Sequence, residues 1–205
     1  MGYWRFDERG GVAALDASGN GNPGSFVAGA RRKNGKVGLA LELDGTRDYV
    51  SVPDSAILNP GPALWTVAAW IRKKGPDQET VLFKDDGNFT HYYWLAVGSR
   101  AVFSVSAGDT PIKAQGSTSI NDGNWHHVAG VRSAPRTLQV YIDGVLDGTK
   151  NVEGAAIEIQ TTSPLKIGSG ITDAGLHPFG GSIDEVRVFN RALSAEEIKR
   201  LYLGR

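Results

Sequence analysis

The sequence predicts an all-β fold, a two-sheet antiparallel jelly-roll sandwich with one short C-terminal helix. Short runs of alternating apolar and polar residues recur along the chain. The 27 glycines are spread through all 205 residues and supply the turns between these runs. Only the last dozen residues show a helical period. The chain has no cysteine, but at this length it can bury a substantial core without disulfides.

The expected strands are short segments with period-two alternation, bounded by turn-forming residues. No composition shift or proline-rich linker divides them, so we expect residues 1–205 to form a single domain. No signal peptide opens the chain, and we interpret it as a domain excised from a larger protein. In chain order the expected strands are Leu39–Leu43, Tyr49–Val52, Trp65–Arg72, Thr80–Phe83, Tyr92–Gly98, Ala101–Ser106, Lys113–Ser117, Trp125–Val131, Leu138–Asp143, Ala156–Ile159, Leu165–Gly168 and Gly181–Asn190.

The segment 193–204 carries the helical pattern. Ser194 is a typical N-cap, and Glu197 three residues later completes a capping box. Gly204 can end the helix in the left-handed conformation. We expect this amphipathic helix to dock on the sandwich in a structural role. Its apolar face consists of Ile198, Leu201 and Tyr202.

The stretch from Asp122 to Gly148 predicts a hairpin of two alternating strands. Within 125–131, odd-numbered residues share one face and even-numbered residues the other. We predict that the face with Trp125 points into the sandwich. His126 and His127 lie on opposite faces, so they cannot jointly bind one metal ion. The apolar face of the partner strand is formed by Leu138, Val140 and Ile142.

The charge balance argues against a nucleic-acid partner. Lys plus Arg and Asp plus Glu both number 22, giving a formal net charge of zero, whereas nucleic-acid binders usually carry a basic excess. Two short basic clusters, residues 31–33 and 72–74, are interpreted as solvated charges in turns. No apolar run approaches the roughly 18 residues of a membrane-crossing helix, so no membrane insertion is expected.

The segment DASGNGN, residues 16–22, is a candidate calcium loop. Glycines at 19 and 21 let the backbone curl so that carbonyl oxygens can also point inward. Calcium takes six to eight oxygen ligands in a flexible geometry. The alternatives are a glycine–asparagine turn held by side-chain hydrogen bonds, or a sodium ion or water in the same place. The oxygen-bearing side chains stand at every second position: Asp16, Ser18, Asn20 and Asn22.

The stretch KDDGNFTHYYWLAVG, residues 84–98, gathers aromatic and polar side chains around a turn, Phe89 among them. Glycan sites pair an aromatic face, which packs on the C–H face of a sugar, with side chains that bind hydroxyl groups. The alternative is a buried strand, since aromatic residues are favoured in sheets. The candidate contacts are Asp86, Asn88, His91, Tyr92 and Trp94.

The loop GITDAGLHPFGG, residues 170–181, is a second candidate ligand rim. Functional residues concentrate on long irregular loops of this kind. Asp173 and His177 are its candidate contacts. The alternative is a long connection required only by the topology.

Several motifs resemble the laminin G-like branch of the concanavalin A-like lectin/glucanase superfamily. They follow the order of that family: DASGNGNPGSF, KVGLALELDGTRDYVSVP, LWTVAAWIRKKG, DGNWHHVAGVR, LQVYIDGVLDG and GGSIDEVRVFNRALSAEEIKRLY. The resemblance covers residues 3–202 and implies a jelly roll whose terminal segments lie together. It also implies a packing role for Trp125. Finally, it implies a structural calcium ion held by Asp16, Asn20 and Asp184.

The same superfamily includes lectins, adhesion domains and enzymes, so the resemblance specifies the fold better than the function. Its retaining glucanases use a Glu-x-Asp-x-Glu strand motif, with the two catalytic carboxyls about 5–5.5 Å apart. The nearest match, Glu42 and Asp44, lacks the second glutamate. His126, Tyr141 and Arg132 do not form a recognisable lyase motif.

These observations predict a non-catalytic carbohydrate-binding, lectin-like module with a structural calcium site. Its expected partners are a glycan or polysaccharide and the neighbouring domains of a larger secreted or cell-surface protein. A structural or adhesive protein-interaction domain without sugar affinity is the alternative. A polysaccharide lyase or glycoside hydrolase is a weaker one.

Overall fold

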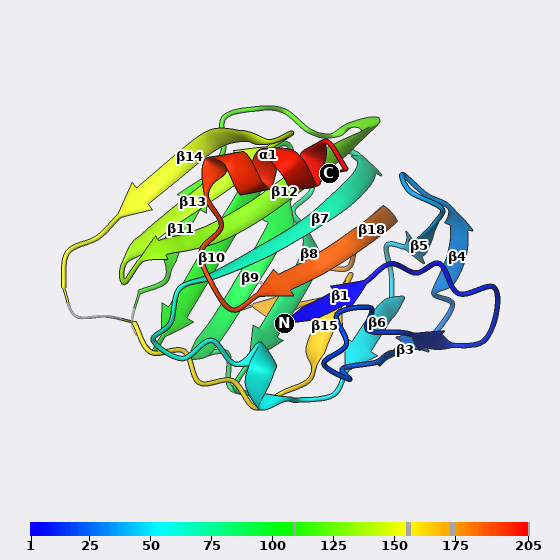
Figure 1. Cartoon of the computed structure of the whole chain (residues 1–205), viewed down its shortest axis with the longest axis horizontal. Helices are drawn as coiled ribbons and strands as arrows, with labels where there is room; N and C mark the ends of the chain where they lie inside the picture. The colour runs from blue at the N-terminus through cyan, green and yellow to red at the C-terminus, as the bar shows by residue number, and fades with distance from the viewer. Residues whose placement is uncertain (109, 155–156, 173–174, 205) are drawn as a thin grey trace.

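Two antiparallel sheets face each other in the computed structural model, which describes residues 1–108, 110–154, 157–172 and 175–204 (Figure 1). Sheet A has the order β14-β13-β12-β7-β18-β5-β4, and β1 pairs with one end of β18. Its strands are β1 (Gly2–Trp4), β4 (Arg31–Asn34), β5 (Leu39–Asp44), β7 (Trp65–Lys74), β12 (Asp122–Ala134), β13 (Thr137–Ile142), β14 (Val145–Asn151) and β18 (Gly180–Phe189).

Sheet B has the order β11-β10-β9-β8-β15-β6-β3-β2. Its strands are β2 (Ala13–Ala14), β3 (Gly24–Val27), β6 (Tyr49–Val52), β8 (Glu79–Asp85), β9 (His91–Val97), β10 (Ala101–Ala107), β11 (Ile112–Gln115) and β15 (Leu165–Ile167). The remaining elements are the 3₁₀ turn η1 (Ala56–Leu58), the short pair β16 (Ile171–Thr172) and β17 (Gly175–Leu176), and the helix α1 (Ala195–Tyr202).

The predicted jelly-roll sandwich is confirmed, with one exception among the expected strands. Ala156–Ile159 is not a strand in its described part, where Ile159 makes only an isolated bridge to Gly61. Terminal segments lie together as expected, because β1 pairs with residues 186–188 of β18. In the described part of the chain, no helix has the length and apolarity needed to span a bilayer.

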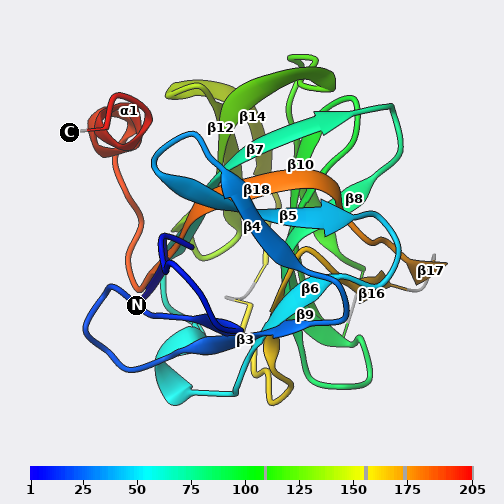
Figure 2. The ribbon, with the colours of Figure 1, turned by 90° about the vertical axis from the view of Figure 1, so that its right-hand side faces the viewer.

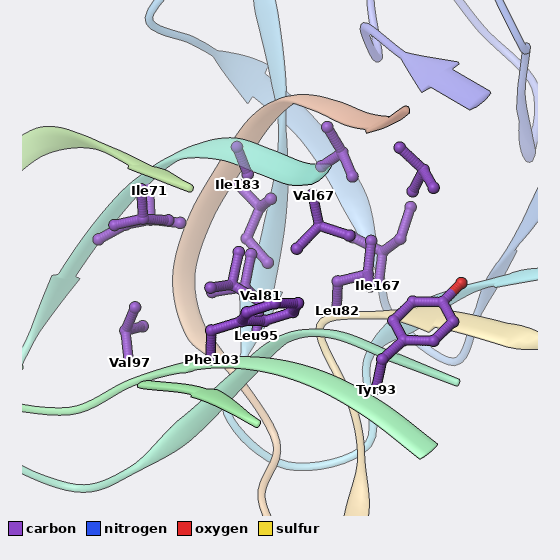
Figure 3. Close-up of a cluster of buried hydrophobic side chains, with 14 of the residues drawn as sticks. Val67, Ile71, Val81, Leu82, Tyr93, Leu95, Val97, Phe103, Ile167 and Ile183 are labelled. Atoms are coloured by element: carbon purple, nitrogen blue, oxygen red, sulfur yellow. The ribbon is translucent and has the colours of Figure 1, made fainter. Parts of the chain in front are cut away.

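The interior lies between the two sheets, where apolar side chains from both meet (Figure 3). Val67, Ile71 and Ile183 come from sheet A, and Leu95 and Phe103 from sheet B. Gly130 of β12 explains one close approach. A Cβ on Gly130 would stand 2.4 Å from the ring of Phe103, so only glycine admits that ring.

The prediction for Trp125 was wrong. Val128 of β12 packs in the interior with the apolar face of β13, whereas Ala129 and Val131, on the same face as Trp125, lie in a separate cluster on the outer side of sheet A. Alternation shows that two faces exist but does not say which one is inward. Both faces of this strand are buried beyond His127, because α1 covers the outer one.

Helix α1 forms as predicted and packs outside sheet A, as Figure 2 shows. Ser194 Oγ accepts a hydrogen bond from the Glu197 amide, and the Glu197 side chain accepts one from the Ser194 amide. Gly204 has a φ of 69°, in the left-handed region. Ile198 is fully buried against the outer cluster of sheet A, and the Tyr202 ring lies 5.5 Å from that of Trp70.

We predicted that the two basic clusters lie in turns, but the structure places both of them in strands. Residues 31–33 belong to β4 at the edge of sheet A, and residues 72–74 end β7. Lys73 is buried and pairs with Glu79 at 3.3 Å. Charged side chains are common on edge strands because they oppose pairing with another chain. The strand β4 therefore lacks the apolar alternation by which strands are predicted from sequence.

Candidate functional site

The outer face of sheet B carries the predicted glycan contacts of β9. Alternation sends Tyr93, Leu95 and Val97 into the interior and leaves Tyr92 and Trp94 on the outer face. There they form a separate cluster with Phe83 of β8. Their position on β9 therefore follows from the strand period alone.

Residues 86–90 form the turn between β8 and β9, and Asp86 organises it. Asp86 Oδ1 accepts hydrogen bonds from the Asn88 amide at 3.0 Å and the Thr90 amide at 3.3 Å. Asp86 Oδ2 accepts from Thr90 Oγ1 and lies 3.2 Å from His91 Nδ1. Burial raises the pKa of Asp86, but the hydrogen bonds from Thr90, Asn88 and His91 outweigh it and hold the pKa at about 2. The carboxylate is thus ionised at neutral pH.

Phe89 is the exposed aromatic residue of the turn. It is 37% exposed, has a φ of 60°, and stacks on Phe83 with ring centroids 6.4 Å apart. A non-glycine residue in the left-handed region is uncommon, and such residues cluster at binding sites. His91, with 36% of its side chain exposed, stands beside the turn. Phe89, His91 and Asn88 therefore present an open aromatic and polar surface.

The loop after β15 folds over the same face and joins the two predicted ligand regions. The His177 ring lies 5.5 Å from that of Trp94, and the Thr80 amide donates to the His177 carbonyl oxygen at 3.0 Å. Trp94 Nε1 donates to Thr80 Oγ1 at 3.0 Å. Figure 2 shows the β16–β17 pair of this loop beyond the edge of the sandwich. Asp173, the other predicted contact here, lies outside the described residues.

This cover changes the roles predicted for two residues. Trp94 is 3% exposed and Tyr92 is 6% exposed, so neither offers a free ring to a sugar. They follow the alternative, in which aromatic side chains pack on a covered sheet. The open surface consists of Asp86, Asn88, Phe89 and His91, which we name the 86–91 rim. The sequence contained a signal for Phe89, because the glycine-containing DDGN turn leaves the next residue at the loop tip.

The predicted calcium loop, residues 16–22, is a tightly bonded turn around two groups. Asp16 Oδ1 accepts from the amides of Tyr3 and Ser18, and Oδ2 accepts from the Asn22 amide and side chain. Burial raises the pKa of Asp16, but the hydrogen bonds from Ser18 and Asn22 lower it to about 2. The Met1 carbonyl oxygen is the second group, and three side chains of the loop donate to it: Ser18, Asn20 and Asn22.

Asp184 does not join this loop. Its Oδ2 accepts the amides of Lys36 and Val37 at 2.9 Å each, and its Oδ1 accepts the Glu185 amide. Burial raises the pKa of Asp184 to about 7 against the effect of these hydrogen bonds. Among the described residues, no three His, Cys, Asp or Glu side chains are grouped as metal ligands would be.

The residues considered for catalysis are separated. Glu42 Oε1 pairs with Lys33 at 3.0 Å, whereas Asp44 accepts the amide and hydroxyl of Thr46 within its own turn. His126 shares the inner face with Val128, and Tyr141 belongs to the outer cluster under α1. The Arg132 guanidinium donates to backbone carbonyl oxygens, including Ile157 O at 2.7 Å.

Comparison with known proteins agrees with this architecture. A family profile described as "Concanavalin A-like lectin/glucanases superfamily", of the laminin G type, matches residues 44–199. The chain belongs to this superfamily. The adhesion G-protein coupled receptor V1 of Danio rerio is 25% identical over 151 residues, which are 68% of this chain and 2% of the receptor.

Solved structures share the fold of this superfamily member. Domain 4 of AbnA, a GH43 extracellular arabinanase from Geobacillus stearothermophilus, was solved with arabinotriose; it is 19% identical, with a TM-score of 0.74 and coverage of 98% of this chain and 97% of that domain. The binding domain of botulinum neurotoxin DC, solved with rat synaptotagmin II, is 14% identical, with a TM-score of 0.79 and coverage of 100% of this chain and 51% of the toxin domain. At these identities the likeness shows the fold alone.

Proposed function

We propose that this chain is a non-catalytic carbohydrate-binding module that binds glycans at the 86–91 rim. The observation that carries the proposal is the exposed Phe89 ring beside His91 and the ionised Asp86. An apolar ring face buries the C–H face of a sugar, while carboxylate, imidazole and amide groups bind its hydroxyl groups. The arabinotriose complex of a domain with this fold supports the same ligand class.

The proposed module belongs to a secreted or cell-surface protein and carries a structural calcium ion in the 16–22 loop. The loop fits the ion chemically. Rotating the side-chain amides of Asn20 and Asn22 by half a turn would direct their oxygens to the region of the Met1 carbonyl oxygen and Ser18 Oγ. Oxygen donors of this kind are those that calcium prefers. Bound there, the ion would fix the N-terminal loop.

Glycan binding is tested on a panel of neutral oligosaccharides that includes arabinotriose, by isothermal titration calorimetry. We expect Phe89→Ala to weaken binding about tenfold, which corresponds to about 1.4 kcal/mol. Ile57→Ala is the matched control, because Ile57 is also 37% exposed but lies in η1. Equal affinities for the wild type and Phe89→Ala would reject the rim as the site.

A protein-interaction domain is the second candidate function. The matched adhesion receptor and the toxin domain solved with synaptotagmin II favour it. Absence of binding across the whole neutral panel at millimolar concentration would favour this candidate over the glycan module.

A further inference from the structure

A pocket on the outer face of sheet A brings together both basic clusters of the sequence. One row of residues crosses neighbouring strands there, because Glu42 of β5 pairs with Ser182 of β18, Ser182 pairs with Arg72 of β7, and Arg72 pairs with Trp125 of β12. The pocket has a volume of about 270 Å³. It is lined by Lys33, Glu42, Arg72, Lys73, Lys74, Gly123, Gly180, Gly181 and Ser182.

Two of the glycines that line this pocket lie where neighbouring atoms approach closely. A Cβ on Gly181 would stand 2.3 Å from the Arg72 carbonyl oxygen, and one on Gly123 would stand 2.6 Å from Lys74 Cε. Any larger residue would therefore displace the strand or the lysine. Glycine at these positions permits the close approach of β18 to β7 and of Lys74 to β12.

The pocket has an excess of positive charge. Lys33 is neutralised by Glu42 at 3.0 Å. Arg72 is half-buried and donates to Ser182 Oγ at 3.3 Å, with its guanidinium 4.9 Å from the Trp125 ring centre. Within the described ranges, neither Arg72 nor Lys74 has a carboxylate at ion-pair distance. A half-buried guanidinium without a counter-ion favours an incoming anion, which its planar fork binds bidentately.

The remaining groups match a saccharide better than a simple inorganic anion. Trp125 is not among the buried residues and lies at the end of the row. Ser182 supplies a hydroxyl, and the partly exposed Glu42 carboxylate lines the pocket as an acceptor for the hydroxyl groups of a sugar. The pocket volume of about 270 Å³ is slightly below the roughly 300 Å³ at which sites for drug-sized ligands begin, so the pocket suits a single saccharide unit.

We infer that this pocket binds an anionic saccharide, with its carboxylate or sulfate on Arg72 and Lys74 and its ring against Trp125. This site lies on the sheet opposite the 86–91 rim. Only the saccharide nature of its ligand rests on the proposed function. Recognition of the anionic group stands on the pocket itself.

Tryptophan fluorescence provides a selective readout. Four of the five tryptophans, Trp4, Trp65, Trp70 and Trp94, are at most 5% exposed, so a ligand-induced change reports mainly on Trp125. The ligands are a sulfated disaccharide, digalacturonate, neutral arabinotriose and sodium sulfate. We expect saturable binding of at least one anionic saccharide, weakened by added salt. Trp125→Phe should remove the fluorescence change, while calorimetry still detects binding.

Substitutions test whether anionic saccharides bind at this pocket or elsewhere on the surface. Arg72→Gln should weaken anionic binding at least tenfold and Lys74→Gln severalfold; Lys74 is exposed, so this second variant serves if Arg72→Gln fails to fold. Arg200→Gln, an exposed charge on α1, is the control and should bind as the wild type does. Phe89→Ala should also bind anionic saccharides normally, which separates this pocket from the rim.

Three results would overturn the inference. The first is no binding of either anionic saccharide at millimolar concentration. The second is unchanged affinity in both Arg72→Gln and Lys74→Gln. The third is sodium sulfate binding as tightly as the sulfated disaccharide, which would remove the saccharide from the assignment.

Discussion

His127 is a buried histidine of β12 that packs beside Trp70 of β7. It is 3% exposed, and its ring meets that of Trp70 edge to face, with centroids 5.5 Å apart. The pKa of His127 is lowered from 6.5 to about 4, mainly by burial and also by the nearby Arg187, against the opposing effect of Asp143. The native state therefore holds this imidazole neutral at pH values where an unfolded chain would protonate it.

Asp184 has the opposite effect on the pH dependence of stability, over nearly the same pH range as His127. Its pKa is raised from 3.8 to about 7, mainly by burial. Between these values the native state holds a proton that the unfolded state has released, so the contribution of Asp184 to stability increases as the pH falls. The contribution of His127 decreases as the pH falls from 6.5 to 4. The two residues therefore partly cancel in the wild type.

His127→Gln should uncover this cancellation. The gap between pKa 6.5 and about 4 corresponds to at most about 3 kcal/mol of native stability, lost between those pH values. Without the buried imidazole of His127, the variant should lose less stability than the wild type between pH 7 and pH 4.5. Urea unfolding at a series of pH values measures the difference. Parallel pH profiles for the two proteins would show that His127 is not held neutral.

Helix α1 is the element whose formation and position have separate causes. Its start follows from the capping box of Ser194 and Glu197, which depends on local sequence only. Its docking depends on Ile198 and Leu193, which are buried against Ala129 and Val131 of β12. This contact turns the outer face of β12 into a second apolar layer.

Ser194→Ala should test the local part. Loss of the cap leaves amides at the helix start unpaired and should cost about 1 kcal/mol. Ser119→Ala is the control, since Ser119 is exposed in a loop and its side chain makes no hydrogen bond in the described structure. Thermal unfolding of both variants gives the comparison. An equal effect of the two substitutions would mean that tertiary contacts alone hold α1.

The whole molecule joins its chain ends through β1, β18 and the 16–22 loop. β1 pairs with β18, and the loop carries hydrogen bonds back to Met1 and Tyr3. A ligand bound in this loop would stabilise the folded state as a whole, because the unfolded chain does not preserve the arrangement. Stability of the entire sandwich therefore reports on the proposed calcium ion.

Calcium should raise the unfolding temperature above that measured in EDTA. At a hundredfold excess over Kd the expected stabilisation is about 2.7 kcal/mol, or several degrees for a chain of this length. Asp16→Ala should abolish the shift. Asp184→Asn should retain it, because the Asp184 carboxylate is bound to Lys36 and Val37 instead of the loop. If Asp184→Asn also lost the calcium-dependent rise in unfolding temperature, Asp184 would be a calcium ligand, as the family resemblance implies.

Local patterns in the sequence were sufficient for most strands, for α1 and for the 86–91 turn. Period-two alternation, capping residues and glycine turns act over a few neighbouring positions, so they can be read without the fold. The same patterns placed Asp86, Asn88 and His91 correctly around one turn. They could not tell that Trp94 is covered, because His177, which covers it, is 83 residues away along the chain.

The tertiary structure alone decided which faces are open and which distant residues meet. Alternation shows which residues share a face with Trp125, but it does not show whether that face points into the sandwich. A strand that is covered by a second sheet on one side and by a helix on the other is apolar on both faces. The basic clusters at 31–33 and 72–74 meet only because β18 lies between β5 and β7. Strand order is set by packing of the whole chain, so the pocket at Arg72 has no signature in any single segment.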